Sequence, residues 1–383
     1  MIDANELRRQ AREVARSGAR EEFFLFYRLM FPILAPEEKV FIESKHYLAL
    51  ATALQKVVTG ETPRLLIAIP PRHGKSRLAS VALPAWILGL DPTAKIICAS
   101  YGDQLAKDFA LRTREVLRSA DYQAIFPNTS LDIGGSALEE LRTTAKGYRL
   151  GTSVGGVVTG KGANYVIVDD PMKAIDAPSD IARNEVYDWV KLSLMTRFDK
   201  PAEGRVIVVM QRLHQDDLIG RLLADGGWTL LEMPGKSIKK QIFDLGNGNE
   251  WVYEPGDYLF QERFDEKAHE NLRYDLEEAG YNAQILQCPG ALGGTLFKVK
   301  NFPRYEKLPP YFEAIVQSWD PTSVENDTAA FTVCTTWGIV KRKLYLINVF
   351  RKRLDFYKVE PAILSMKKKY GSSGNRVGGF EGS

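Results

Sequence analysis

The sequence predicts an α/β protein whose main part is a mostly parallel sheet with helices on both faces. Apolar runs that indicate buried strands lie at residues 65–69, 94–100, 165–168 and 206–210. Segments that favour helices lie between or after them, at residues 77–88, 104–117 and 213–223, and the last helix is expected to start near Asp216 and Asp217. Strands that alternate with helices are typical of parallel sheets, whose functional side chains gather at the carboxyl ends of the strands.

The first apolar run leads into a candidate phosphate-binding loop. The sequence Pro70-Pro71-Arg72-His73-Gly74-Lys75-Ser76 places Gly-Lys-Ser between a strand and a helix. In such a loop the backbone N–H groups bind phosphates, the lysine reaches the β- and γ-phosphates, and the serine hydroxyl binds Mg²⁺. The usual pattern begins with a glycine where this chain has Ile69, so the motif alone also fits a chance occurrence.

Two adjacent carboxylates follow the third apolar run. Asp169 and Asp170 come directly after residues 165–168, at a strand end where ligands bind in open α/β sheets. Asp169 is the candidate for Mg²⁺ binding, and Asp170 is the candidate for orienting an attacking water or accepting its proton. The alternative is that the two acids only cap a helix.

Two further segments are candidates for the same site. Gln211 and Arg212 follow the fourth apolar run, where we expect them beside the γ-phosphate; alternatively they cap the strand and contact solvent. Residues 151–162 are rich in glycine and hydroxyl side chains. They fit either a hairpin with flexible turns or a loop whose backbone approaches a phosphate chain.

Length, charge and cysteine content limit the kinds of protein that this chain can be. With 383 residues the chain is long enough for two domains, and its net charge of +3 neither requires nor excludes a nucleic-acid partner. The three cysteines have no metal-ligand spacing and no obvious disulfide framework, which fits a reducing cytoplasm. The charged N-terminus does not resemble a signal peptide, and no apolar run is long enough to span a bilayer.

The order of segments predicts four parts. These are an N-terminal helical segment, a phosphate-loop domain, a linker region and a second α/β domain, at residues 1–35, 36–235, 236–300 and 301–383. The first part is an arginine-rich amphipathic helix packed on the main domain or, alternatively, a nucleic-acid arm. The last part has three strand patterns, a helix and a fourth strand pattern, with Asp320 and Glu381 at strand ends. Carboxylates gathered at strand ends are what two-metal phosphodiester cleavage requires.

Taken together, these segments resemble the large terminase subunit of tailed bacteriophages, which is a DNA-packaging ATPase with an attached nuclease. The resemblance covers nearly the whole chain in the family's order and rests on seven motifs. They are Pro-Pro-Arg-His-Gly-Lys-Ser (70–76), Ala-Ser-Tyr (99–101), Gly-Thr-Ser-Val-Gly-Gly-Val-Val-Thr-Gly-Lys-Gly (151–162), Val-Asp-Asp-Pro (168–171), Met-Gln-Arg-Leu-His-Gln-Asp-Asp-Leu (210–218), Ser-Trp-Asp-Pro (318–321) and Cys-Thr-Thr-Trp-Gly (334–338).

The resemblance implies a P-loop domain of the RecA/ASCE-like kind and assigns roles within it. It implies that Pro71 to Ser76 bind ATP, that Ser76 and Asp169 bind Mg²⁺, and that Arg72 acts on the γ-phosphate. Asp170 stands where many relatives carry a catalytic Glu. Gln211 and Arg212 match the segment that couples hydrolysis to motion, although many relatives have Thr where this chain has Gln211.

The resemblance also implies a ribonuclease H-like second domain that uses acids on Mg²⁺ or Mn²⁺. Asp320 matches the first acid and Glu381 fits the second, whereas the third belongs to a later segment than this sequence contains. The sequence therefore resembles a C-terminally truncated terminase. The implied partners are double-stranded DNA, the portal protein, the small terminase subunit and further copies in a ring on the procapsid. The implied location is the host cytoplasm, with no place in the mature virion and no membrane contact.

Two other functions remain open from the sequence. One is a helicase-like or repair ATPase that acts on DNA without a capsid. The other is a decayed prophage fragment that binds partners without turnover, which the intact phosphate loop and the Asp169-Asp170 pair oppose.

Because a third nuclease carboxylate is missing from the sequence, we expect the 383-residue chain to cut DNA poorly or not at all. A plasmid-linearisation assay with Mn²⁺ measures this. Linearisation by the purified chain, together with its loss in the Asp320→Ala variant, would contradict the expectation.

Overall fold

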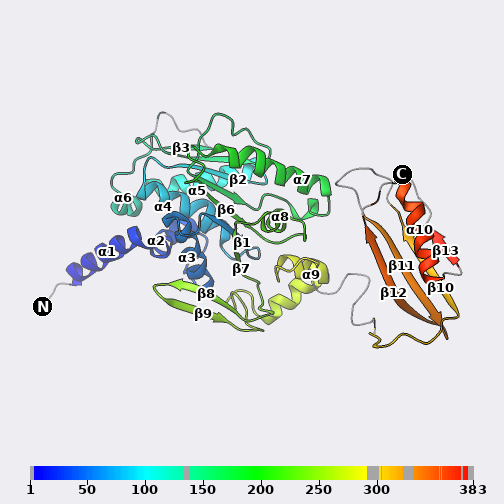
Figure 1. The fold of residues 1–383 in the computed structure, drawn as a ribbon. Coiled ribbons are helices and arrows are strands. Elements are labelled where there is room, and N and C mark those ends of the chain that lie inside the picture. Colours follow the sequence, from blue (N-terminus) through cyan, green and yellow to red (C-terminus); the bar gives the residue numbers. More distant parts are fainter. Residues whose placement is uncertain are drawn as a thin grey trace. The chain divides into compact units, whose positions relative to one another are not determined.

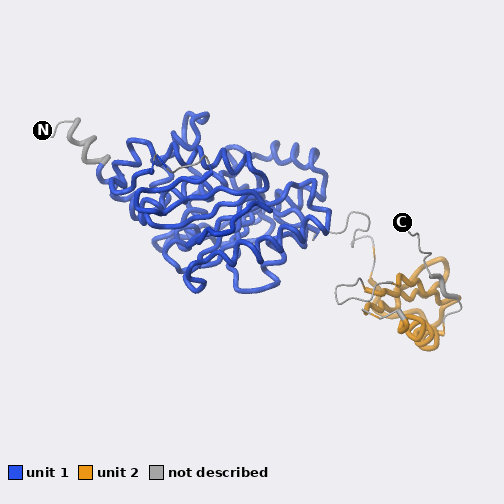
Figure 2. Tube along the Cα trace, turned by 90° about the horizontal axis from the view of Figure 1, so that it is seen from above, with its two compact units in different colours: residues 1–299 blue, residues 300–383 orange. Residues whose placement is uncertain are grey.

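The structure is a computed structural model, which describes residues 4–132, 134, 139–290, 302, 304–321, 331–352, 354, 356–371 and 374–377. The chain divides into two compact units, residues 1–299 and 300–383 (Figures 1 and 2). Each unit has its own sheet and its own hydrophobic core, so each is described by itself.

The first unit is built on a seven-stranded sheet. Its spatial order is β3-β4-β2-β5-β6-β1-β7, and every pairing is parallel except β3 with β4. The strands are β1 (Arg64–Ala68), β2 (Lys95–Ser100), β3 (Glu140–Arg142), β4 (Tyr148–Ser153), β5 (Tyr165–Asp169), β6 (Arg205–Met210) and β7 (Thr229–Glu232). The α/β fold with a mostly parallel sheet, predicted from the sequence, is confirmed.

Helices cover both faces of this sheet because alternate strand residues point to opposite sides. Ile67, Ile96 and Val209 belong to one buried cluster. It includes residues of α2 (Phe23–Leu34), α3 (Lys45–Thr59), the π-helical turn η1 (Arg77–Ala82), α4 (Leu83–Leu90), α5 (Asp103–Arg118) and α6 (Ala120–Ile125).

The opposite face carries a second buried cluster. Leu66, Ile97 and Val208 lie in it. It includes residues of α7 (Asp180–Asp188), the π-helical turn η3 (Trp189–Leu194) and α8 (Leu218–Asp225). Burial on both faces explains why the central strands are continuous apolar runs rather than alternating ones.

The remaining elements of the first unit lie at its ends and edges. They are α1 (Ala4–Glu21), the short 3-10 turns η2 (Ala174–Asp176) and η4 (Met195–Arg197), the hairpin β8 (Gln241–Gly246) with β9 (Asn249–Tyr253), and α9 (Glu266–Gln284). The hairpin packs on α3 through Lys56, whose ammonium lies 2.5 Å from the Asp244 carboxylate. Among the described helices, none combines the length and apolarity needed to cross a membrane.

The second unit is a four-stranded sheet of order β12-β11-β10-β13. Its strands are β10 (Ala314–Asp320), β11 (Thr332–Val340), β12 (Lys343–Lys352) and β13 (Gly374–Val377), and its helix is α10 (Phe356–Tyr370). The first three are antiparallel and β13 runs parallel to β10. Trp319, Cys334 and Met366 form its buried core. The Lys341-Arg342 link has φ of 47° and 61°, as the tight hairpin predicted there requires.

Several elements were not foreseen from the sequence. The glycine-rich segment 151–162 supplies the end of β4 and then turns with positive φ at Gly155 and Gly160. The edge strand β7 and the hairpin β8–β9 carry only short apolar stretches, such as Leu230-Leu231 and Trp251-Val252-Tyr253, and were not predicted as strands. By contrast, the helix expected to start near Asp216 and Asp217 does begin there, at Leu218, because the Asp217 carboxylate caps it by accepting from the Gly220 N–H.

The packing of α4 can be tested at Gly89. A Cβ added there would lie 2.4 Å from the Phe126 ring. Although alanine normally favours a helix over glycine, we expect Gly89→Ala to destabilise the fold by about 1–3 kcal/mol, measured by urea unfolding. In a Phe126→Leu background the same substitution should cost much less; an equal cost in both backgrounds would show that the ring is not the cause.

Candidate functional site

A cleft of about 400 Å³ opens at the carboxyl edge of the main sheet. It is lined by both loop residues and residues far from the loop in sequence: Glu37, Glu38, Pro71, Arg72, Gly74, Lys75, Ser76, Arg77, Asp170 and Arg263. Most of the predicted phosphate-loop residues and one of the two predicted carboxylates therefore share one cavity.

The phosphate loop turns back beneath this cleft with an unusual backbone. Arg72 has φ 65° and Gly74 has φ 76°. A Cβ on Gly74 would lie 2.4 Å from the Tyr47 ring, so only glycine fits there. Ile69, which replaces the usual first glycine, is fully buried and its N–H bonds the Met210 carbonyl at 3.1 Å. It continues the pairing of β1 with β6, and the turn begins only after it.

Lys75 and Asp170 meet inside the cleft. The lysine ammonium lies 2.9 Å from Asp170 Oδ2, and their side chains are 6% and 26% exposed. Because β6 separates β1 from β5, the two strand ends are two strand spacings apart, roughly 10 Å, and the long lysine side chain spans that gap. Asp170 has φ 43° and its Oδ1 accepts from the Gln211 N–H at 3.2 Å.

Asp169 lies beneath the cleft rather than in its lining. Its side chain is 1% exposed, and Oδ2 accepts a hydrogen bond from the Ser80 hydroxyl at 2.6 Å. Burial and the neighbouring Asp170 raise the pKa of this carboxyl from 3.8 to about 7, against the hydrogen bond from Ser80. Its Oδ1 is buried with no hydrogen-bond partner among the described residues.

These features fit a magnesium ion held by few protein ligands. A cation beside Oδ1 would satisfy that oxygen and favour the charged carboxylate. Mg²⁺ takes oxygen ligands and usually only one or two from protein, with phosphate and water completing the shell. The Ser76 hydroxyl and Asp169 supply such oxygens. Over the described parts of the chain no group of three His, Cys, Asp or Glu side chains forms a dedicated metal cage.

His73 is placed differently from the other loop residues. It is 3% exposed, and its ring stacks on Phe264 at a centroid distance of 4.7 Å. Burial lowers the pKa of this imidazole from 6.5 to about 4. The predicted ATP-binding role of His73 stays a prediction. Its buried ring packs against Phe264 and does not line the cleft.

Gln211 and Arg212 follow β6, but their side chains do not line the cleft. The Arg212 Nε donates to both Asp217 carboxylate oxygens, at 3.1 and 2.9 Å, in a buried ion pair. Its backbone N–H donates to Gln287 Oε1 at 2.9 Å. The structure therefore connects this loop to Asp170 through the Gln211 N–H and to the end of the first unit through Gln287.

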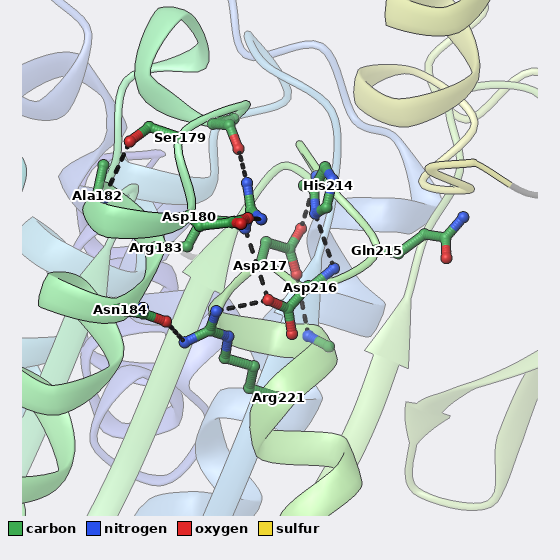
Figure 3. Close-up of polar contacts among 12 residues, drawn as sticks. Ser179, Asp180, Ala182, Arg183, Asn184, His214, Gln215, Asp216, Asp217 and Arg221 are labelled. Atoms are coloured by element: carbon green, nitrogen blue, oxygen red, sulfur yellow. Dashed lines mark hydrogen bonds and ion pairs between the residues drawn. The ribbon is translucent and has the colours of Figure 1, made fainter. Parts of the chain in front are cut away.

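The same loop is tied to α7 on its other side (Figure 3). The Asp216 carboxylate lies 2.5 Å from Arg221 and 3.6 Å from the buried Arg183 guanidinium. Arg183 in turn pairs with Asp180 at the start of α7. Charged side chains thus join the loop after β6 to α7.

Three charged residues at the far end of the cleft were not predicted from the sequence: Glu38, Arg77 and Arg263. Glu38 lies between Arg77 and Arg263, with a nitrogen–oxygen distance of 2.7 Å to each. Burial alone would raise the pKa of Glu38, but the hydrogen bonds from Arg263 and Arg77 lower it. These three residues come from segments distant in sequence, and no motif links them.

In the second unit, Asp320 ends β10 and is exposed. Glu381 lies outside the described residues. The predicted pairing of these two acids on metal ions therefore stays a prediction.

Comparisons with known proteins find a family match over part of the first unit. Residues 66–201 match the family model described as terminase large subunit, T4likevirus-type, N-terminal. The resemblance predicted from the motifs is confirmed by this match. No curated protein matches the sequence.

Solved structures of large terminases are also similar to the chain. The HK97 bacteriophage large terminase is 13% identical, with a TM-score of 0.47 over 94% of this chain and 74% of that one. The large terminase of the thermophilic bacteriophage D6E is 10% identical, with a TM-score of 0.42 over 88% and 78%. The same D6E protein in complex with ADP is 11% identical, with a TM-score of 0.38 over 88% and 77%.

The buried histidines predict a pH dependence of stability. In His73 and His269 burial lowers the pKa from 6.5 to about 4. Below pH 6.5 these imidazoles bind protons in the unfolded chain but not in the folded one, so the stability that they contribute should fall as pH drops from about 6.5 toward 4. The raised pKa of Asp169 acts in the opposite direction over this range, so the histidine contribution is the difference in slope between the wild type and a histidine variant. Urea unfolding at several pH values measures the slope.

His73→Phe keeps an aromatic ring on Phe264 and should reduce that slope, whereas His214→Gln, at a half-buried histidine, serves as the matched control. Equal slopes in the wild type and His73→Phe would contradict the assignment.

Proposed function

We propose that this chain, which carries the large terminase N-terminal region at residues 66–201, hydrolyses ATP to drive double-stranded viral DNA into a procapsid. The observation that carries the proposal is the meeting of Lys75 and Asp170 in the cleft beside the phosphate loop. Phosphoryl transfer needs a cation for the phosphates, a loop of backbone N–H groups and a carboxylate that can orient water. Here these are Lys75, the loop at residues 70–76 and Asp170, which follows β5.

Nucleotide binding would replace the ion pair between Lys75 and Asp170 by contacts between Lys75 and phosphate. The ammonium pairs with Asp170 Oδ2 at 2.9 Å. The β- and γ-phosphates would compete for the ammonium, because together they carry more negative charge than one carboxylate. The loop backbone around Arg72 and Gly74 is already in the left-handed conformation that turns successive N–H groups to one side. Arg72 lines the cleft and would meet the γ-phosphate.

Release from Lys75 would leave Asp170 free to act on water. Its Oδ1 is held by the Gln211 N–H at 3.2 Å, so Oδ2 is the oxygen that would orient the attacking water or accept its proton. In this scheme the base becomes available only when phosphates have taken the lysine. Ser76 and Asp169 would hold Mg²⁺, which would supply positive charge against the charge of the phosphates.

The loop after β6 is the proposed route from hydrolysis to motion. Gln211 contacts Asp170 through its backbone, and the next residue, Arg212, contacts Gln287. A shift of Asp170 on hydrolysis would therefore reach the residues that precede the second unit. The Arg212–Asp217 ion pair keeps the loop rigid enough to transmit it.

For the second unit we propose a metal-dependent endonuclease that cuts concatemeric DNA, with Asp320 and Glu381 as metal ligands. The portal protein, the small terminase subunit and a ring of identical subunits are the proposed partners. These proposals rest on the family resemblance and on the order of strands and helix in residues 314–377.

Lys75→Ala should reduce ATP turnover by ~10²-fold or more, because it removes the main phosphate cation. A phosphate-release assay with and without DNA measures this. Lys95→Ala is the matched control: Lys95 starts β2, at the amino edge of the sheet, and its ammonium pairs with Asp199 at 2.7 Å.

Near full-rate turnover by Lys75→Ala would overturn the site assignment. Stimulation of the wild-type ATPase by portal or small subunit would support packaging, whereas strand separation without them would favour a helicase-like enzyme.

A further inference from the structure

Ser80 contacts the buried carboxylate that the proposed function assigns to Mg²⁺. It lies one helical turn after Ser76, is 1% exposed, and donates to Asp169 Oδ2 at 2.6 Å. The other oxygen, Oδ1, has no hydrogen-bond partner among the described residues. Ser80 therefore fixes which carboxylate oxygen remains available.

The backbone around Ser80 is distorted for an identifiable reason. In an α-helix its carbonyl would accept from the N–H of residue 84, but residue 84 is Pro84, which has no N–H and whose ring clashes with that carbonyl. At this point the chain forms the π-helical turn η1, in which the Leu83 N–H donates to the Leu78 carbonyl. Such turns displace carbonyl groups from the regular ladder.

Arg149 reaches the Ser80 carbonyl from β4. Its Nη2 lies 3.4 Å from that oxygen, and its side chain is fully buried. Its Nε and Nη1 have no hydrogen-bond partner among the described residues. Nη1 lies 2.6 Å from where a Cβ on Gly151 would be, so glycine at 151 leaves the space the guanidinium occupies.

A buried guanidinium without a carboxylate partner is costly to the fold. No ion pair of Arg149 is found among the described residues. Its side chain lies near the Ser80 carbonyl and the Cys98 thiol, whose pKa burial raises and Arg149 partly lowers. Stability therefore does not explain this arginine, whereas its contact with the residue that holds Asp169 does.

We propose that Ser80 and Arg149 are positioning residues for the Mg²⁺ carboxylate, in which Ser80 holds Asp169 Oδ2 and Arg149 holds the proline-displaced turn that carries Ser80. The inference rests on the proposed ATPase function. Without Ser80, Asp169 can rotate toward the Lys75 ammonium, which is needed for phosphate.

The test measures metal binding without turnover. Mn²⁺ is titrated into the full chain with ADP, and bound Mn²⁺ is followed by electron paramagnetic resonance. Ser80→Ala should weaken Mn²⁺·ADP binding about 10–100-fold, the range for groups that orient metal ligands, with ADP binding in the absence of metal unchanged. Ser80→Thr, which keeps the hydroxyl, should restore most of the affinity.

Arg149→Met should weaken Mn²⁺·ADP binding in the same direction while leaving the urea midpoint equal to or above that of the wild type, because a buried unpaired cation is removed. A merely structural arginine would instead lower the midpoint and leave metal binding intact. Ser100→Ala is the matched control: Ser100 is also buried and pairs in register with Asp169, but its hydroxyl lies 3.4 Å from the Gly102 carbonyl.

Ser80→Ala with wild-type Mn²⁺·ADP affinity would overturn this inference alone. A wild-type chain that binds no Mn²⁺·ADP would overturn the proposed function and this inference together. Equal losses in Ser80→Ala and Ser100→Ala would show that any buried hydroxyl at this sheet edge matters, and would also overturn the assignment.

Discussion

The ion pair between Lys75 and Asp170 is the interaction on which the proposed ATPase site depends. It joins the loop after β1 to the tip of β5 across the intervening strand β6, with 2.9 Å between nitrogen and oxygen. Both groups are largely withdrawn from water, so each is held in place where a triphosphate and its attacking water would need them. The pair leaves the lysine and the carboxylate occupied by each other until a stronger anion enters the cleft.

The rest of the first unit supplies the rigidity that this pair requires. Two separate apolar clusters, one on each face, fix the strands whose ends carry the site. Polar groups in and around the cleft are held by specific partners: Asp169 by Ser80, Arg212 by Asp217, and Glu38 by Arg77 and Arg263. Each constrains an element near the cleft, and Gln287 extends the constraint to the end of the unit.

The sequence predicted the parts of the fold in which local pattern and burial agree. The continuous apolar runs of β1, β2, β5 and β6 are buried on both faces, so each was visible as a strand, and Gly-Lys-Ser and Asp169-Asp170 were visible at their ends. The edge strand β7 and the three-residue β3 carry no such run. Glu38 and Arg263 could not be found because only tertiary folding brings them together, and Arg212 was expected to face phosphate because no local pattern shows that Asp217 would bind its guanidinium. Ser80 had one signal, its spacing of one helical turn from Ser76.

The most direct test is a structure of the chain with Mg²⁺ and a non-hydrolysable ATP analogue. We expect that the Lys75 ammonium leaves Asp170 for the β- and γ-phosphates, that Asp170 Oδ2 turns to a water in line with the γ-phosphate, and that Asp169 keeps its bond to Ser80. A bound analogue with the Lys75–Asp170 pair intact, or one seated away from the loop at residues 70–76, would contradict this expectation.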